Sequence, residues 1–189
     1  MNAHLPLKTT FGAEIIRSQP VKSIIPVGTW WKIEHYRKGQ LIDHWEQKNV
    51  NTTEGLNHML DVTFHGTTTI GTWYMGLFED DYTPLVSNTY AAPGFTESTA
   101  YTEATRPAFV EAAASSKVTS NNASKAAFTM NATKTIYGAF LCGGGTDGST
   151  KGNTDGGGTL FASSKFSSAK SVVNTDILLV SCTITLADA

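Results

Sequence analysis

One stretch of the chain has the composition of a loop that could bind phosphate or a metal ion. Residues 142–158, CGGGTDGSTKGNTDGGG, combine many glycines with Asp147, Lys151 and Asp155. A phosphate-binding loop needs glycine, lysine and a hydroxyl residue in that order, whereas here Gly148 is followed by Ser-Thr-Lys without a strand-to-helix context. A calcium-binding loop of the GGxGxD type needs further copies, and this one match is imperfect. We therefore expect a flexible, exposed hairpin loop, with a structural Ca²⁺ as the less favoured alternative.

The cysteines and histidines give no recognisable metal motif. Cys142 and Cys182 are the two cysteines of the chain. We expect them to be reduced thiols, although a bridge between two packed strands is the alternative. His35 and His44 could face each other across a hairpin, but no carboxylate or cysteine is placed to complete the ligand set. The sequence thus predicts neither a metal nor a cofactor.

Acidic and nucleophilic residues do not indicate catalysis either. Glu79, Asp80 and Asp81 fall within one turn, where like charges are ordinarily solvated. The sequence contains neither G-x-S-x-G nor H-E-x-x-H, the patterns of common hydrolases and zinc proteases. We expect a non-enzymatic protein.

The composition further narrows the possible classes of protein. The chain has 189 residues, enough for one domain with a sizeable core, alone or with a small appendage. Its net charge of −2 without a Lys/Arg cluster argues against nucleic-acid binding, which needs a basic face. No window approaches 18 apolar residues, and the first residues lack a secretion signal. We expect no membrane partner and synthesis in a cytosol.

Short alternating segments dominate the second half of the chain and predict strands. The last of them, Ile177–Leu186, places Leu178, Val180 and Cys182 on one face, as a half-buried antiparallel strand does. Turn residues separate the segments. These patterns predict an all-β fold, an antiparallel β-sandwich or jelly roll. The expected strands are Thr72–Glu79, Phe95–Tyr101, Pro107–Ala112, Ala126–Asn131, Thr135–Cys142, Thr159–Phe166 and Ile177–Leu186.

A short helix and a hairpin precede these strands. Residues 51–66 show helical spacing of Leu56, Met59, Leu60 and Phe64. Asn51 with Glu54 resembles a capping box, and Gly66 ends the helix. Residues 29–50 are expected to form a β-hairpin that turns at Lys38-Gly39. Together with an arm over residues 1–28 and a β-sandwich domain over residues 67–189, these segments make up the predicted organisation.

The first 28 residues are too apolar for a solvated tail, and Pro6, Pro20 and Pro26 exclude a long helix. Such an extended N-terminal arm gains stability by lying on another surface, which we expect to be a neighbouring chain. Trp31 is expected in the core, whereas core and interface roles both stay open for Trp30 and Trp45. The interface candidates are Leu5, Phe11, Ile15, Ile16, Ile24, Ile25, Trp30 and Trp45.

Three motifs carry a family resemblance: TWYMGLF at Thr72–Phe78, EATRP at Glu103–Pro107 and DILLVSCTITL at Asp176–Leu186. With the segments around them, from Val50 to Ala189, they resemble small structural proteins encoded among the virion genes of tailed double-stranded DNA bacteriophages. That family has no catalytic residues to transfer to this chain.

The resemblance implies a copy-rich component of the virion, of the head decoration or cement type. Such a protein would lie on the capsid surface and bridge neighbouring capsid subunits to stabilise the head. Its partners would be the major capsid protein and copies of itself, as a dimer or trimer. The alternatives are a tail or fibre component that binds a receptor or glycan, and a head–tail connector piece.

Overall fold

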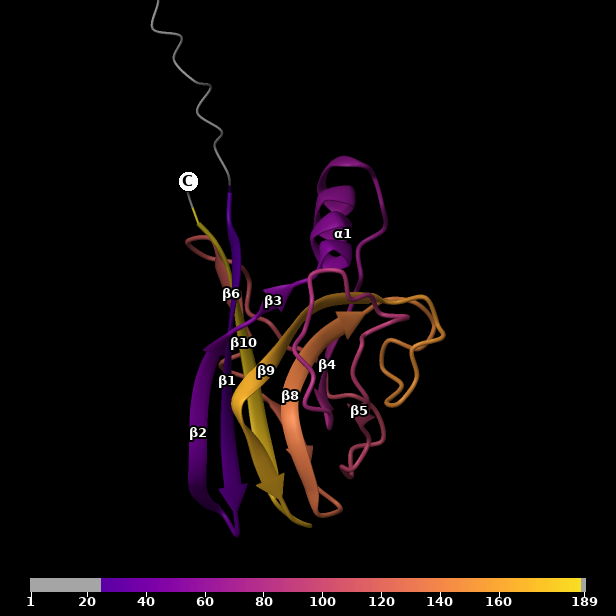
Figure 1. The fold of residues 1–189 in the computed structure, drawn as a ribbon. Coiled ribbons are helices and arrows are strands. Elements are labelled where there is room, and N and C mark those ends of the chain that lie inside the picture. The colour runs from indigo at the N-terminus through magenta and orange to yellow at the C-terminus, as the bar shows by residue number, and fades with distance from the viewer. Residues whose placement is uncertain (1–24, 188–189) are drawn as a thin grey trace, which may run out of the picture.

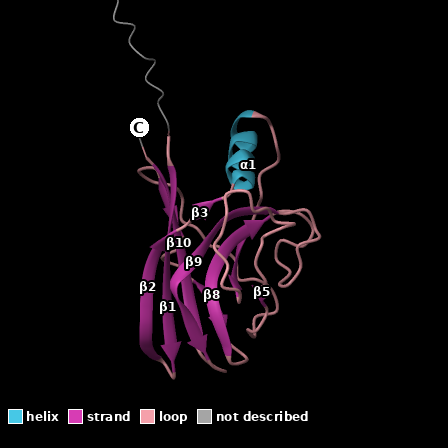
Figure 2. Cartoon of the chain, in the orientation of Figure 1, coloured by secondary structure: helices cyan, strands magenta, loops and turns pink. Residues whose placement is uncertain are grey.

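The protein folds into two antiparallel β-sheets packed face to face, with one short helix among the described residues (Figures 1 and 2). The structure is a computed structural model and describes residues 25–187. The first sheet has the order β2 (Gln40–Lys48), β1 (Val27–Arg37), β10 (Ile177–Leu186), and both β6 (Val118–Ser120) and β7 (Ala126–Thr129) pair with the far side of β10. The second has the order β3 (Val50–Asn51), β9 (Thr159–Val172), β8 (Lys134–Gly143), β4 (Trp73–Phe78), β5 (Glu97–Ser98). This confirms the predicted all-β sandwich; its jelly-roll form stays a prediction.

The predicted hairpin is part of the first sheet. β1 and β2 are joined by Lys38 and Gly39, both at positive φ (50° and 76°), as a two-residue hairpin turn requires. β1 pairs with β10 from Val27 opposite Leu186 to Tyr36 opposite Ile177. Because this ladder runs along nearly all of β1, the hairpin belongs to the sandwich and is not a separate cap.

The main core fills the space between the sheets. Alternate residues of β1 and β10 point inward, so that Trp31, Ile33, Val180 and Cys182 are fully buried. From the second sheet, Met75, Leu77, Ile136, Leu141 and Phe161 belong to the same cluster. Period-two alternation along β1 and β10 therefore places one face of each of these strands in this core.

The second sheet is covered on its outer face as well. Phe78, Phe140 and Leu160 point outward from β4, β8 and β9 and pack with Tyr90 and Phe95. Both aromatic residues come from the long segment between β4 and β6. β4 has apolar residues on both faces because both of its faces are covered.

Two expected strands are wrong in whole or in large part. Of Phe95–Tyr101 only β5, two residues long, is a strand, and Pro107–Ala112 forms none. The latter segment touches β4 through a single bridge between Ala108 and Tyr74. Their apolar residues are buried because these segments run as loops across a sheet. A loop buried in this way has the same apolar composition as a strand. Conversely, β6 forms between the expected strands Pro107–Ala112 and Ala126–Asn131, where the sequence predicts no strand.

Helix α1 (Thr53–Phe64) forms as predicted but is capped differently. Thr52, not Asn51, is the N-cap, and its Oγ1 accepts a hydrogen bond from Gly55 N at 3.0 Å. Glu54 does not close a capping box; its carboxylate accepts hydrogen bonds from the backbone N–H groups of Tyr90 and Leu160. The helix is thereby fixed at its first turn, while its far end leaves the body of the sandwich (Figure 1).

Substituting Gly138→Ala tests the close packing of the outer layer. A Cβ at this position would overlap the Phe78 ring and the Ser164 carbonyl oxygen. We expect the free energy of unfolding to fall by roughly 1–3 kcal/mol, as overpacking does. Denaturant unfolding measures it. Gly28→Ala, where an added Cβ meets nothing within 4 Å, is the matched control, and an equal loss in both variants would contradict the packing argument.

Candidate interaction site

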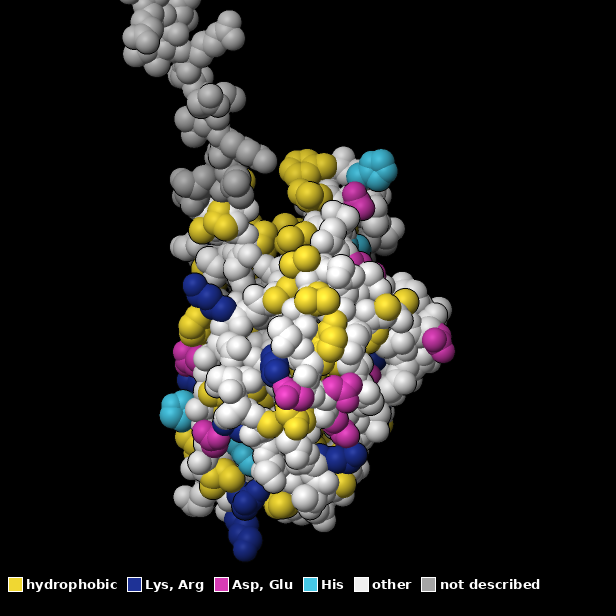
Figure 3. Space-filling model, in the orientation of Figure 1, with side chains coloured by type: hydrophobic (Ala, Val, Ile, Leu, Met, Phe, Trp, Pro, Cys, Tyr) yellow, Lys and Arg dark blue, Asp and Glu magenta, His cyan; other side chains and the backbone are white. Residues whose placement is uncertain are grey.

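A groove of about 410 Å³ opens between α1 and the end of the first sheet. Its walls come from the inner side of α1, from β6 and the last residues of β10, and its floor from β4 and β9. The lining is mainly apolar and includes Met59, Val62, Trp73, Phe161, Ile184 and Leu186. Space-filling atoms show hydrophobic side chains gathered at this end of the molecule, on α1 and at the base of the notch beside it (Figure 3).

The floor of the groove is rigid because it is the upper boundary of the core. The rings of Trp73 and Phe161 meet edge to face with centroids 5.6 Å apart, and His58 from α1 packs edge-on to Trp73 at 5.8 Å. Gly55 allows the first turn of α1 to lie directly on the backbone of Phe161, since an added Cβ would overlap it. The helix therefore stands at a fixed position over this end of the sandwich.

Exposed apolar side chains lie on the elements at either side of the groove. Phe64 is 82% exposed and Leu60 51%, both on α1. Ile25, at 67%, and Leu186, at 37%, lie on the other side, because Val27 pairs with Leu186 and Ala187 N donates to Pro26 O. Single exposed apolar residues are common, but several around one apolar hollow mark an interaction site.

The sequence-predicted interface residues are distributed unevenly. Leu5, Phe11, Ile15, Ile16 and Ile24 lie outside the described residues. Ile25 is exposed beside the groove.

The two tryptophans that were left open have different environments. Trp30 is 41% exposed on the outer face of the first sheet, where its Nε1 donates to Glu46 at 3.1 Å. Trp45 is only 9% exposed and packs edge-on against Phe166, with the Lys170 amine 4.4 Å from its ring centroid. Trp45 is therefore a core residue with little surface to offer another chain.

Sequence reasoning did not find the groove. Trp73 and Phe161 were placed on strands, but their partners across the end of the sandwich depend on the position of α1. One signal was present: the apolar stripe of α1 includes Leu60 and Phe64, which the structure leaves exposed. A helix with more apolar surface than its own domain covers is a sign of a partner.

The Gly-rich loop is organised around a buried arginine that the sequence reasoning also missed. Arg106 is 1% exposed and forms a two-pronged ion pair with Glu97, with N–O distances of 2.8 and 2.7 Å. Its remaining N–H groups donate to the carbonyls of Gly148 and Asn153 at 3.0 and 2.9 Å and to the Tyr90 hydroxyl.

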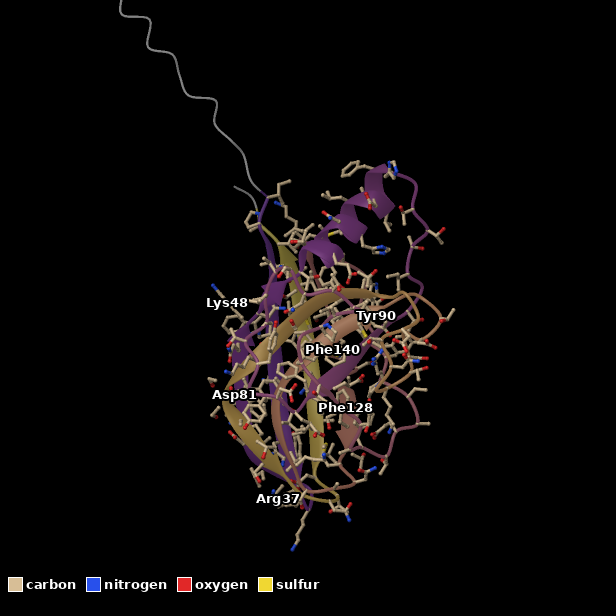
Figure 4. All side chains as sticks on the ribbon, turned by 45° about the vertical axis from the view of Figure 1, so that its right-hand side comes forward. Arg37, Lys48, Asp81, Tyr90, Phe128 and Phe140 are labelled. Carbon is tan, nitrogen blue, oxygen red and sulfur yellow. The ribbon has the colours of Figure 1, made fainter. Side chains whose placement is uncertain are left out.

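Tyr90 extends this anchor. Burial raises the pKa of its hydroxyl, which donates to the loop carbonyls of Asp147 and Asn153. The side chains of Tyr90 and Phe140 lie close together beside the loop (Figure 4). The loop is therefore held to the second sheet at several points, and the expectation of a freely exposed flexible hairpin is corrected.

A second buried ionic cluster lies at the end of the sandwich away from the groove, where Figure 4 labels Arg37. Asp176 is 1% exposed and bonds Arg37 through both carboxylate oxygens, at 2.9 and 2.8 Å, and His35 Nε2 at 2.8 Å. The Arg37 hydrogen bonds hold the Asp176 pKa well below its usual range. The cluster joins the end of β1 to the start of β10 and has the geometry of a structural fastening.

The remaining chemistry-bearing residues do not converge. Cys142 and Cys182 are free and buried, and burial raises the pKa of Cys142 to about 12. Within residues 25–187, no three or more His, Cys, Asp or Glu side chains are grouped to hold a metal ion. No helix in that range is both long and apolar enough to cross a membrane.

Comparison with known proteins gives no relative: no protein-family model matches the sequence, and no curated protein matches it either.

Substituting Arg106→Gln should release the Gly-rich loop. The substitution leaves Glu97 without its partner, and loss of one member of a buried ion pair costs roughly 3–5 kcal/mol. We expect a corresponding loss in the free energy of unfolding and faster trypsin cleavage after Lys151, read by mass spectrometry. Lys134→Gln, which removes a half-exposed pair with Glu79, should cost under about 1 kcal/mol. Equal cleavage of the two variants would contradict the anchoring role of Arg106.

Asp176 should make the protein sensitive to acid. Since its pKa is lowered in the folded state, its contribution to stability is present above the unfolded pKa of roughly 3.9 and is lost as pH falls below that value. Asp176→Asn should lower the free energy of unfolding by roughly 1–3 kcal/mol at pH 7 and flatten its decline below pH 4. Denaturant unfolding from pH 7 to pH 3 measures both. An unchanged acid slope in the variant would assign the decline to other carboxylates.

Proposed function

We propose that this chain is a non-enzymatic structural protein of the virion of a tailed double-stranded DNA bacteriophage, a capsid decoration or cement protein. In this role it binds at the capsid surface, bridges neighbouring capsid subunits and stabilises the head. Its partners are the major capsid protein and further copies of itself.

The observation that carries the proposal is the gathering of exposed apolar surface at one end of a rigid sandwich. Leu60 and Phe64 are exposed on α1, which forms one wall of an apolar groove, and Ile25 is exposed near the pairing of Val27 with the groove residue Leu186. The apolar first 24 residues precede Ile25 in the chain. Burying one such side chain contributes roughly 1.5–3 kcal/mol. Neighbouring molecules that bury these exposed apolar side chains would therefore supply much of the binding energy.

The remainder of the fold suits a component that must keep its shape under load. The Gly-rich loop is held by Arg106, and the two ends of the first sheet are fastened by the β1–β10 ladder and the Asp176 cluster. A protein that binds the assembled shell and not its separate subunits stabilises the assembled state by mass action. Contact area across subunit boundaries provides that preference.

The motifs at Thr72–Phe78, Glu103–Pro107 and Asp176–Leu186 support the same family on separate grounds. In the structure they are β4, the segment around the Arg106 anchor, and β10 with its Asp176 cluster. These are the elements that organise the second sheet, the loop and the first sheet. The resemblance therefore rests on residues that determine this fold.

A tail or fibre component that binds a glycan is the second candidate, and one observation favours it. Trp30 is half-exposed beside a shallow polar hollow on the outer face of the first sheet, lined also by Lys32, Glu46 and Lys125. An aromatic ring beside charged and amide groups is a common sugar-binding arrangement. A head–tail connector piece is the third reading, and it predicts a ring of few copies.

Binding to particles separates these roles. Empty capsids of the phage that encodes this chain, stripped of it, should bind the added full chain in hundreds of copies, counted from a stained gel after sedimentation. Removal of residues 1–24 should weaken binding at least tenfold and leave the β-sandwich folded, because the deletion stops before Val27 pairs with Leu186. Circular dichroism checks the fold.

Trp30→Ala is the matched control, since it removes an exposed aromatic residue from another face. Decoration predicts that this variant binds capsids as the full chain does. A few copies per particle, or binding that is lost with Trp30 and kept without residues 1–24, would favour the tail or fibre role.

A further inference from the structure

We infer that the groove between α1 and β10 receives the N-terminal segment, residues 1–24, of a second copy of this chain. The inference rests on the proposed function and deepens it, because it assigns a specific occupant to the groove. Copies bound to a capsid would then be linked to one another as well as to the shell.

The chemistry of groove and segment is complementary. The groove is lined mainly by apolar side chains, with Trp73 and Phe161 at its floor and Met59 and Val62 on its helix wall. The segment supplies apolar side chains interspersed with polar ones: Leu5, Leu7, Phe11, Ile15 and Ile16. Exposed Phe64 and Leu60 extend the apolar surface beyond the hollow, so that more than one side chain of the segment finds cover.

Charge favours the same pairing. Lys8, Arg17 and Lys22 against Glu14 give the segment a net charge of +2, and since the whole chain carries −2, the rest carries −4. Glu111 and Lys117 both line the groove, and Asp61 is exposed on α1. The favourable charge therefore lies in the opposite net charges of the segment and the rest of the chain. Opposite net charges speed encounter and orient the partners.

The point at which the segment joins the body places it near the groove. Ile25 precedes Pro26, whose carbonyl accepts a hydrogen bond from Ala187 N at 3.1 Å, directly after the groove residue Leu186. A chain of 24 residues can span at most roughly 80 Å, well beyond its own domain. Its length is therefore enough to enter the groove of an adjacent copy.

The entry into β1 favours the groove of a neighbour over the segment's own. Pro26 fixes its own φ and biases Ile25 toward an extended backbone. Val27 already pairs with Leu186, so the chain enters the sheet in line with β1. To reach its own groove, the chain would have to reverse its direction before it enters β1, whereas the groove of a neighbour can be reached along the line of β1.

Exchange of the N-terminal segment can be mutual or one-way. If two copies exchange segments with each other, the contact is mutual and a dimer closes. If each copy gives its segment to the next, the contact is one-way and produces a ring or an open lattice. In both forms each interface needs one intact segment and one intact groove.

A complementation experiment with the full-length chain tests this requirement. The segment variant carries Ile15→Ser and Ile16→Ser, and the groove variant carries Val62→Glu. Sedimentation velocity across a hundredfold concentration range should show association of the unchanged chain and at least tenfold weaker association of each variant alone. An equimolar mixture of the two should form a 1:1 complex, because it contains one intact segment and one intact groove.

The double substitution Leu41→Ser and Ile42→Ser is the matched control. These residues are 50% and 48% exposed at the β1–β2 hairpin, away from the groove, and should leave association unchanged. Circular dichroism and melting temperature confirm that every variant is folded. A mixture that stays monomeric, or an unchanged chain that is monomeric throughout, overturns the inference.

Capsid binding measured on the same variants keeps the two proposals apart. If self-association fails while capsids still bind hundreds of copies, the groove assignment is wrong and the decoration role stands. If the mixture forms its 1:1 complex while capsids bind none, the exchange stands and the decoration role is wrong.

Discussion

The ladder between β1 and β10 is the interaction on which the rest of the structure depends. It joins the first and last strands of the fold along ten residue pairs, from Val27–Leu186 to Tyr36–Ile177. Through it Trp31 and Ile33 come to face the second sheet, and β6 and β7 find an edge to pair with. Asp176 fastens one end of the ladder by binding Arg37 and His35. At its other end β10 contributes Ile184 and Leu186 to the groove, and β1 begins where the N-terminal segment joins the body.

Two regions thus divide the tasks of the molecule. The Arg106 anchor and the outer aromatic cluster hold the second sheet and its loops in place. The end that carries α1 leaves several apolar side chains exposed, because no other part of the domain packs on them. Since Phe64 and Ile25 are exposed while the floor beneath them is fully packed, the exposed surface is preorganised. Binding there costs little ordering of the body, which favours affinity.

Much of the fold could be predicted from the sequence because its last strand alternates clearly and its first hairpin has a recognisable turn. β10 coincides with the expected Ile177–Leu186, and the hairpin turn lies at Lys38-Gly39 as expected. Failures concentrated in residues 79–125, where Phe95 and Phe109 are buried as parts of loops. The local spacing of apolar residues in the sequence indicates burial, but it does not distinguish a buried loop from a buried strand. Arg106 and the groove were missed for a related reason: both are made by residues far apart in the chain, and no spacing in the sequence encodes their meeting.

The direction of β1 has a mechanical consequence. A pull on the N-terminal segment acts along the axis of β1, parallel to the strands on either side of it. The hydrogen bonds to β2 and β10 then bear the force together, in shear, instead of opening one after another from an end. A domain tethered in this way resists extraction far better than one whose first strand can be peeled off. A load on the N-terminal segment therefore meets the whole β1 ladder at once, before the domain can unfold.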